Sequence, residues 1–435
     1  MKNLPSLLLA LLLAACATAQ APAGSLDRIA EDYVRLQLAI GEKEEGYIDA
    51  YYGPPEWREQ ARADAPAATL AQLATRTAEL VARIGFAEAV SSFPAGSVEA
   101  RRSGFLRAQL TAADTRLRML RGERLSFAEE ARGLYGITPE LRPIEAYDPV
   151  LTRIENLVPG TGPLNERVEA FQSRFAIPAD RLDAVMREAI AECRRRTAAL
   201  IPLPGGEQFT LEFVTDKSWS GYNWYQGNYR SLIQVNTDMP VRLSRAIDLG
   251  CHEGYPGHHA HNALLERELA RGRGWVEYMV YPLFSPQSLI AEGSANYGYE
   301  LAFPGDERLA YETRVLYPLA GLPTEGAAEY LALQEAMQDL AGARFTIARD
   351  FLEGRIDRAR ALDLTRRYQL VSPARAEQLL AFTEQYRSYV INYGLGRDMV
   401  AAWIEAQGTS QEARWAAMRR LLSEPTLPSD LIVRP

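Results

Sequence analysis

The stretch from Cys251 to His261 holds the residues with the greatest capacity for chemistry. The chain has four histidines among its 435 residues, and all four lie in this stretch, at positions 252, 258, 259 and 261. Imidazole is the commonest metal ligand and the usual proton carrier near neutral pH. Glu253 follows the first histidine, which places a carboxylate where a metal-dependent hydrolase needs one. The stretch therefore predicts a metal centre, with a histidine-rich solvated helix as the alternative.

The spacing of the histidines differs from the one that zinc hydrolases use on an unbroken helix. In the HExxH arrangement, histidines at i and i+4 share one face of a helix and bind the same ion. Here position i+4 from His252 is Pro256, which has no ligand atom. His259, at i+7, shares the face but lies about 10.5 Å along a regular helix. A regular helix therefore cannot bring His252 and a second histidine to one ion.

Pro256 and Gly257 offer a break in that helix. Proline lacks the backbone N–H that a helix needs, and glycine permits unusual backbone angles. If the two residues loop out as a bulge, His258 falls where i+4 would be, and Glu253 lies beside the ion as a general base. Helix bulges of this kind tend to occur at functional sites.

Two alternatives to this ligand pair stay open. His258 and His261, three residues apart, could bind a metal ion without Glu253, and His259 could replace His258 as the second ligand. We favour His252 with His258 because this pair alone uses the adjacent carboxylate.

Residues on both sides of the histidines complete a resemblance to a known family. The core HEGYPGHH, at 252–259, is preceded by the residues VNT at 235–237 and followed by EGSANY at 292–297. This resembles the bacterial family named domain of unknown function 885, whose members carry an HE-x-x-PGHH core and then an EGWA-x-Y segment. The resemblance covers roughly residues 221 to 300, and Ser294 stands where the family usually has tryptophan.

That family is similar at a distance to helical zinc peptidases such as carboxypeptidase Taq and thimet oligopeptidase. The resemblance implies a mainly α fold, a large helical metallopeptidase-like structure with a small β-sheet next to the metal-site helix. It implies Zn²⁺ as the cofactor, bound by His252, His258 and Glu292, with Glu253 as the general base. The other carboxylates within reach along the chain, outside the EGxAxY pattern, are Glu266, Glu268 and Glu300.

Further segments supply candidates for catalysis and substrate binding. Residues 389–397 resemble the family's Y-x-x-G segment, and the related peptidases use a tyrosine from a distant helix to hydrogen-bond the oxyanion. Tyr393 is therefore the candidate for this catalytic role. The candidate substrate-binding residues are Tyr222, Tyr225, Asn236 and Arg397.

Periodicity and helix caps predict the elements that position these residues. In chain order we expect a helix from about 178 to 200, strands at 209–214 and 231–235, and helices over about 238–253, 258–270 and 286–303. The last three helices would bring the metal ligands together. In the related peptidases an edge strand beside the metal helix binds the substrate backbone. The aromatic stretch at 47–55 is expected to be a packed loop, with a cleft wall as the alternative.

The N-terminus predicts export. Residues 1–15 have a basic start and a short apolar core, as a signal peptide does. The residues LAAC at 13–16 resemble a bacterial lipobox, so Cys16 would be lipidated and followed by a linker to residue 24. A single catalytic domain would span 25–435, with a helical lobe over about 25–200 and a metal-site lobe over about 201–435. We expect a membrane-anchored lipoprotein facing the periplasm or cell surface; a soluble periplasmic protein cut after Ala19 or Ala21 is the alternative.

The charge composition excludes one class of partner. The formal net charge is −8 and no basic stripe is present, which argues against nucleic acid as a partner.

We expect Cys251 to be a packed core thiol, and the sequence does not show whether it pairs with Cys193. The function that fits is an exported zinc-dependent hydrolase, a metallopeptidase acting on peptides. The alternatives are a non-catalytic lipoprotein that binds peptide or metal, and an iron site, whose facial triad normally lies on strands of a β-barrel.

Overall fold

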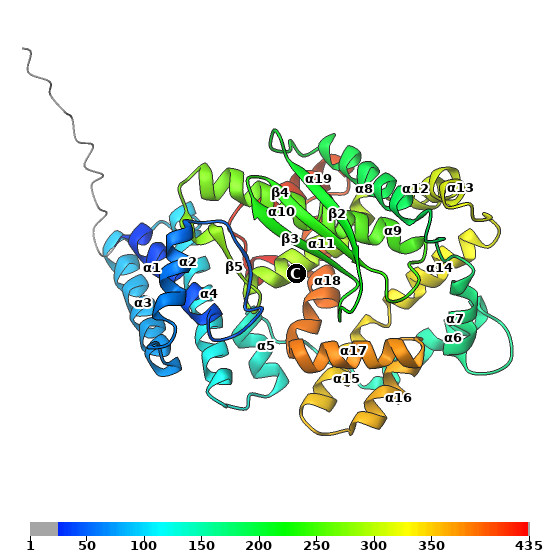
Figure 1. Ribbon diagram of the computed structural model, residues 1–435, viewed down its shortest axis with the longest axis horizontal. Coiled ribbons are helices and arrows are strands. Elements are labelled where there is room, and N and C mark those ends of the chain that lie inside the picture. The colour runs from blue at the N-terminus through cyan, green and yellow to red at the C-terminus, as the bar shows by residue number, and fades with distance from the viewer. Residues whose placement is uncertain (1–24, 434–435) are drawn as a thin grey trace, which may run out of the picture.

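The computed structural model describes residues 25–433 and is mainly helical. Figure 1 shows α1 to α4 grouped at one end, α6, α7 and α12 to α14 at the other, and a three-stranded sheet between them. The elements up to the sheet are α1 (Leu26–Gly41), β1 (Ile48–Tyr51), α2 (Pro55–Asp64), α3 (Leu70–Ser91), α4 (Val98–Leu120), α5 (Phe127–Tyr135), η1 (Ile144–Tyr147), α6 (Asp148–Leu157), α7 (Leu164–Ser173) and α8 (Leu182–Ala198).

After α8 the chain forms the three strands of the sheet and then a second series of helices. The central elements are β2 (Gln208–Val214), β3 (Gly221–Gly227), β4 (Arg230–Asn236), α9 (Ser244–Leu249), η2 (Gly250–Gly254), α10 (His258–Leu265), η3 (Glu266–Arg271), η4 (Val276–Met279), β5 (Val280–Pro282) and α11 (Pro286–Ala302). The last elements are α12 (Glu307–Tyr311), η5 (Glu312–Leu316), α13 (Tyr317–Ala320), α14 (Ala327–Gln338), α15 (Ala341–Leu352), α16 (Arg358–Tyr368), α17 (Pro373–Tyr386), η6 (Arg387–Val390), α18 (Ile391–Glu405), α19 (Gln411–Ser423) and η7 (Pro428–Leu431).

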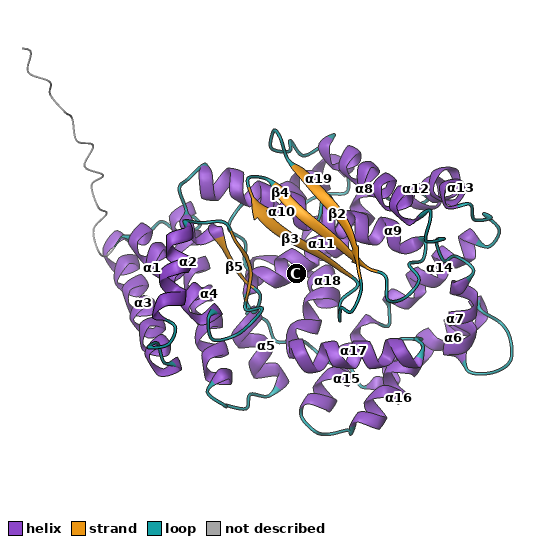
Figure 2. Ribbon diagram, viewed as in Figure 1, coloured by secondary structure: helices purple, strands orange, loops and turns teal. Residues whose placement is uncertain are grey.

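Figure 2 shows the three-stranded sheet in orange among the helices, and strand β3 of this sheet contacts the turn that carries Glu253. Strand β4 pairs in parallel with β2 and antiparallel with β3, so the order is β2-β4-β3. The side-chain amide of Asn223 on β3 donates to the backbone oxygen of Glu253 at 2.7 Å. This confirms the mainly α fold with a small sheet next to the candidate metal-site helix. The aromatic stretch after 218 supplies β3, which is an edge strand of this sheet.

The helix that leads to His252 begins later than predicted. We expected a start near Asp238, but α9 begins at Ser244. The Asp238 carboxylate accepts hydrogen bonds from the backbone N–H groups of Asp216 and Lys217, so it does not cap a helix. The intervening residues run alongside residues 176 and 177 through a β-bridge and a backbone hydrogen bond. The start of α11 after Ser285 and the start of α10 at His258 are as predicted.

Helices α11 and α18 cross in direct backbone contact at two glycines. A Cβ atom added to Gly293 would lie 2.5 Å from the carbonyl carbon of Gly396, and one added to Gly396 would lie 2.8 Å from the backbone oxygen of Leu289. Only glycine therefore permits this approach. The crossing fixes the residue before Gly293, which is Glu292, against the helix that carries Tyr393.

The hydrophobic core forms one large cluster and several smaller ones. The large cluster contains side chains from α1 at one end of the chain to Leu431 near the other. A second cluster joins residues of α6 to residues of α14 through α17. The predicted division of the domain into lobes near residue 200 stays a prediction.

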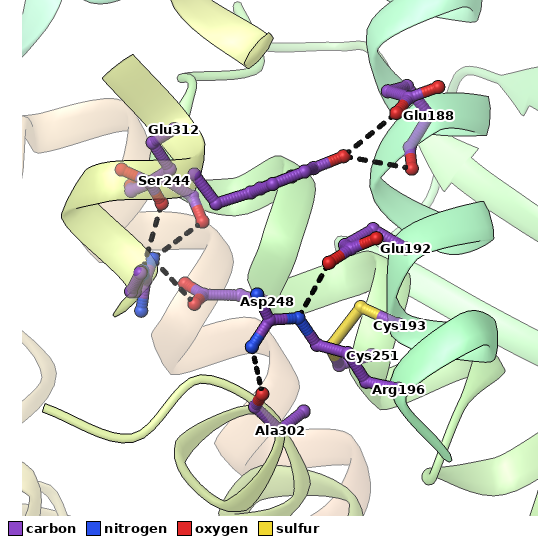
Figure 3. The surroundings of a disulfide bond; sticks show 11 residues. Glu188, Glu192, Cys193, Arg196, Ser244, Asp248, Cys251, Ala302 and Glu312 are labelled. Carbon is purple, nitrogen blue, oxygen red and sulfur yellow. Dashed lines mark hydrogen bonds and ion pairs between the residues drawn. A yellow bond between two sulfur atoms is a disulfide. The ribbon is translucent and has the colours of Figure 1, made fainter. Parts of the chain in front are cut away.

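Cys193 and Cys251 form a disulfide that ties α8 to η2, with their Cα atoms 5.4 Å apart. The expectation that Cys251 is a free core thiol is wrong, because α8 packs directly against the turn that carries it. Figure 3 shows the surroundings: Arg196 of α8 donates to Glu192 and to the backbone oxygen of Ala302, both at 2.7 Å. Helix α8 is thus joined to the turn before His252 and to the end of α11.

We expect the disulfide to contribute substantially to stability, because it closes a loop between residues 58 positions apart. On the chain-entropy model a loop of this size is worth about 4 kcal/mol. The double variant Cys193→Ala/Cys251→Ala should therefore unfold at lower denaturant than the oxidised protein, and reduction of the wild type should have a similar effect. Chemical denaturation followed by circular dichroism measures both. Two free thiols at these positions in peptide mapping without reductant would contradict the cross-link.

Candidate metal centre

The break after Glu253 returns the chain toward His252. The π-helical turn η2 ends at Gly254, Tyr255 to Gly257 leave the helix, and α10 begins at His258. The Gly257 N–H donates to the backbone oxygen of Cys251 at 3.0 Å. A Cβ atom on Gly257 would lie 1.9 Å from the backbone oxygen of His252, so only glycine fits. The break therefore involves three residues, whereas a two-residue bulge was expected.

The two histidine rings meet across this break. The Nε2 atoms of His252 and His258 lie 3.1 Å apart, with the rings nearly perpendicular. On α11, Oε2 of Glu292 lies 3.2 Å from Nε2 of His252 and 3.8 Å from that of His258. The structure thus brings together the three residues that the sequence nominated as ligands.

The remaining histidines point elsewhere. His259 is fully buried, and its ring nitrogens lie 2.8 Å from Oγ of Ser231 and 3.0 Å from Oε2 of Glu207. His261 is buried and does not belong to the group of converging ligand atoms. The alternative carboxylates are occupied as well: Glu266 pairs with Arg271, Glu268 with Arg267, and Glu300 with Arg397.

The three converging side chains fit a transition-metal ion such as zinc. Their ligand atoms all lie within 4.8 Å of one another. Tetrahedral ligands at about 2.1 Å from one ion lie roughly 3.4 Å apart, which is close to the separations observed. Oε2 of Glu292 is buried and has no hydrogen-bond donor among the described residues, while Oε1 accepts from the hydroxyl of Tyr389 at 2.8 Å. A hydrogen bond of this kind orients a ligating carboxylate.

Burial and neighbouring charges set the protonation of the group. Burial, followed by the charge of His252, lowers the pKa of His258 to about 4, so its imidazole is neutral at pH 7 and able to bind a metal ion. Burial raises the pKa of Glu292, but the adjacent rings of His252 and His258 and the hydrogen bond from Tyr389 outweigh it, and the net shift is downward. Burial would lower the pKa of His252, but the adjacent carboxylates of Glu253 and Glu292 raise it overall.

Glu253 presents a carboxylate to the same space. Its side chain is buried, and Oε2 has no hydrogen-bond partner among the described residues. Strand β3 approaches closely, because a Cβ atom on Gly221 would lie 2.6 Å from Oε1 of Glu253. Burial raises the pKa of Glu253 to about 7. A carboxylate without donors and with a pKa near neutrality has the properties of a general base.

A cleft of about 1160 Å³ opens onto this group, and all four residues line it. Tyr222 lines it and donates to Asp49 at 3.0 Å; Asn236 lines it and donates to two backbone oxygens at 2.9 Å. Tyr393 also lines the cleft, and no described residue accepts or donates a hydrogen bond at its hydroxyl.

Two predicted substrate-binding residues lie outside the cleft. Tyr225 is buried and its hydroxyl donates to Glu266, and the Arg397 guanidinium pairs with Glu300 and Asp398. Neither belongs to the cleft lining among the described residues. Their side chains are engaged in holding neighbouring elements together, so the structure does not place them where a substrate would bind.

Sequence reasoning missed two residues of the site. Tyr389 bonds Glu292 from the segment that also contains Tyr393, and the segment's motif was the available signal. Asp49 belongs to the aromatic stretch at 47–55, which forms β1 and contributes to the cleft wall. Burial raises the pKa of Asp49 to about 7, against the hydrogen bond from Tyr222. No local pattern singled out this aspartate.

The fold has counterparts of low sequence identity among solved structures. No family model matches the chain, and none of the curated proteins matches it. A solved structure from Colwellia psychrerythraea described as a lipoprotein is 15% identical, with a TM-score of 0.47, over 83% of this chain and 71% of that one. The structure of BsuCP is 12% identical, with a TM-score of 0.44, over 92% and 88%. Metallocarboxypeptidase 1 of Trypanosoma cruzi is 11% identical, with a TM-score of 0.36, over 91% and 89%.

The converging side chains predict which substitutions remove a metal ion. We expect His252→Ala and His258→Ala each to abolish stoichiometric zinc, because either change removes one of three ligand atoms. His261→Ala should retain it, as should Glu300→Ala, whereas Glu292→Ala should weaken binding severely. Elemental analysis of the purified variants and competition with a chelator measure occupancy and affinity. Zinc retained in His258→Ala, or lost in His261→Ala, would contradict the ligand assignment.

Proposed function

We propose that the protein is a zinc-dependent hydrolase that cleaves peptides, with Glu253 as the general base. The observation that carries this proposal is the meeting of His252, His258 and Glu292 beside the Glu253 carboxylate at the wall of a large cleft. Two imidazoles and one carboxylate are a common ligand set of catalytic zinc, which leaves a coordination position open. The resemblance of residues 221–300 to the domain of unknown function 885 family supports the same proposal.

Zinc would supply a Lewis acid that polarises the scissile carbonyl and lowers the pKa of a water molecule toward ~7. The chain's own residues would do the rest. Glu253 would accept a proton from the attacking water at its free Oε2 and deliver it to the leaving amine. An iron-dependent oxygenase would use a similar ligand set, but its ligands normally lie on strands, and here all three lie on or beside helices.

Two tyrosines would have separate tasks in this mechanism. Tyr389 donates to Glu292 and so would hold that ligand in place. Tyr393, four residues later, lines the cleft with its hydroxyl unengaged among the described residues. It is therefore suited to donate to the oxygen that becomes negative as the carbonyl is attacked.

The edge of β3 offers a place for the substrate backbone. Strand β3 pairs with β4 on one side, and no strand of the described chain pairs with its other side in this sheet. An extended peptide can add to such an edge through main-chain hydrogen bonds, which select little by side chain. A protein that binds peptide or metal without catalysis is the competing function, and the next experiment separates the two.

Substitution of the base should abolish hydrolysis and leave the metal in place. Glu253→Gln keeps the shape but cannot accept the proton, so turnover should fall by at least ~10²–10⁴-fold. Tyr393→Phe should lower turnover by ~10²–10³-fold with little change in substrate binding. A panel of unmodified and terminally blocked peptides measures activity, and elemental analysis serves as the control. Full activity in Glu253→Gln would refute the mechanism, whereas full activity in Tyr393→Phe would only remove this tyrosine from it.

We also propose that the protein is exported and anchored by lipid on Cys16. This residue and the signal sequence lie outside the described residues. Within residues 25–433, no helix has the length and apolar character needed to cross a bilayer. A single acyl chain binds membranes only marginally, so stable anchoring takes more than one.

Cys16→Ser should abolish the membrane attachment that this proposal requires. We expect the wild type in the membrane fraction and the variant in the soluble or unprocessed fraction, because serine has no thiol to carry the lipid. Fractionation and mass spectrometry of the mature N-terminus measure this. A wild-type chain that starts after Ala19 or Ala21 and stays soluble would contradict the proposal.

A further inference from the structure

Two guanidinium groups in the cleft have no carboxylate partner. Arg344 of α15 and Arg375 of α17 line the cleft, and neither forms an ion pair with any described residue. Nε of Arg344 is buried without a hydrogen-bond acceptor. Both side chains are half-buried, and the partners of Arg375 are the neutral Gln378 and Ser220, so each guanidinium keeps a charge that an anion in the cleft would balance.

Other arginines of the same wall have their charge balanced. Arg242 pairs with Glu169 at the cleft wall, and Arg308 pairs with both Asp248 and Glu312. Arg245 lies 3.4 Å from Asp248, which it shares with Arg308. The positive charge that remains therefore belongs mainly to Arg344 and Arg375.

Positive charges of neighbouring arginines surround Arg375. Burial, followed by the charges of Arg245, Arg344 and Arg242, lowers the pKa of Arg375 to about 10. Burial likewise lowers the pKa of Arg344. A bound anion would oppose both downward shifts, because a nearby negative charge favours the protonated guanidinium.

Arg344 packs against a residue of the proposed catalytic group, and Arg375 bonds to the residue that precedes β3. The Arg344 guanidinium carbon lies 5.8 Å from the centre of the Tyr393 ring and 5.1 Å from that of Phe382. Arg375 donates through Nη2 to Oγ of Ser220 at 3.0 Å. Ser220 directly precedes Gly221, whose backbone lies against the Glu253 carboxylate. An anion bound by these arginines would thus lie in the same cleft as the metal ligands and beside Tyr393.

We propose that Arg344 and Arg375 form a binding site for a carboxylate of the peptide substrate, which makes the enzyme selective for bonds near a negatively charged group. The proposal rests on the peptidase function above. Two sources share this chemistry: the free C-terminal carboxylate of the peptide, or the side chain of an aspartate or glutamate. Capture of the C-terminal carboxylate would make the enzyme an exopeptidase, because Arg344 packs against Tyr393 in the same cleft as the proposed base.

The test compares three N-acetylated peptides that differ in the position of one negative charge. The first has uncharged side chains and a free C-terminal carboxylate. The second is its uncharged C-amide, and the third is the C-amide with one Gln replaced by Glu. Each is titrated calorimetrically into Glu253→Gln protein, which would hold it uncleaved, and each is assayed for kcat and KM with the wild type. A hydrogen bond to a charged group is worth about 10- to 100-fold in affinity. The free acid should therefore bind at least about 10-fold more tightly than the amide.

Substitutions then assign the preference to these arginines. Arg344→Gln and Arg375→Gln should each reduce the difference between acid and amide, mainly through KM, and the corresponding lysine variants should restore part of it. Arg360→Gln serves as the control, because Arg360 is exposed on α16 and pairs with Asp363. Tighter binding of the glutamate-containing amide, lost in the same variants, would support the site with a side chain as the source.

Equal binding of all three peptides by the protein would overturn the inference, as would a charge preference that both glutamine variants retain. Neither result depends on hydrolysis, since binding is measured with the Glu253→Gln protein. Absence of hydrolysis by the wild type together with charge-selective binding would refute the proposed function and leave the carboxylate site supported.

Discussion

Two half-buried imidazoles and two buried carboxylates lie against each other at the wall of the cleft, and the surrounding elements hold them there. Removing a carboxylate from water costs several kcal/mol unless donors or a cation compensate it. One oxygen of Glu292 is compensated by Tyr389, but the other, and Oε2 of Glu253, have no donor among the described residues. The negative charge on these carboxylate oxygens is therefore uncompensated within the protein. A divalent cation between the histidines and Glu292 would compensate it.

Three backbone features make this arrangement possible. The π-helical turn and the residues up to Gly257 reverse the chain so that His258 faces His252. The contact of Gly293 with Gly396 brings α11 and α18 close enough for Tyr389 to reach Glu292. On the other side, His259 is held between Ser231 and Glu207, which fixes the start of α10 against the sheet. Each feature fixes the backbone near the site, so the ligand side chains lose little further conformational freedom when they come together.

The parts of the fold and of the candidate site that depend on neighbouring residues in the sequence could be predicted. Ser285 and Pro286 located the start of the helix that carries Glu292. The adjacency of His252 to a carboxylate selected, among three histidines, the one that the structure brings to His252. The start of α9 was misplaced because Asp238 has the residue type of a cap but bonds to distant backbone groups. Asp49, Arg344 and Arg375 could not be predicted, because only the tertiary fold brings them to the cleft. The pairing of Cys193 with Cys251 likewise joins positions that no local pattern connects.

The disulfide links the chemistry of the site to the compartment in which the chain matures. Disulfides persist in oxidising surroundings and are rare where cellular thiols are kept reduced. Cys251 directly precedes His252, so a chain held in a reducing compartment would keep the turn that carries the histidine attached to α8 by packing alone. Oxidation adds a covalent tie between this turn and α8. If the chain is exported as proposed, that tie forms in the oxidising compartment, and the position of His252 then no longer depends on packing alone.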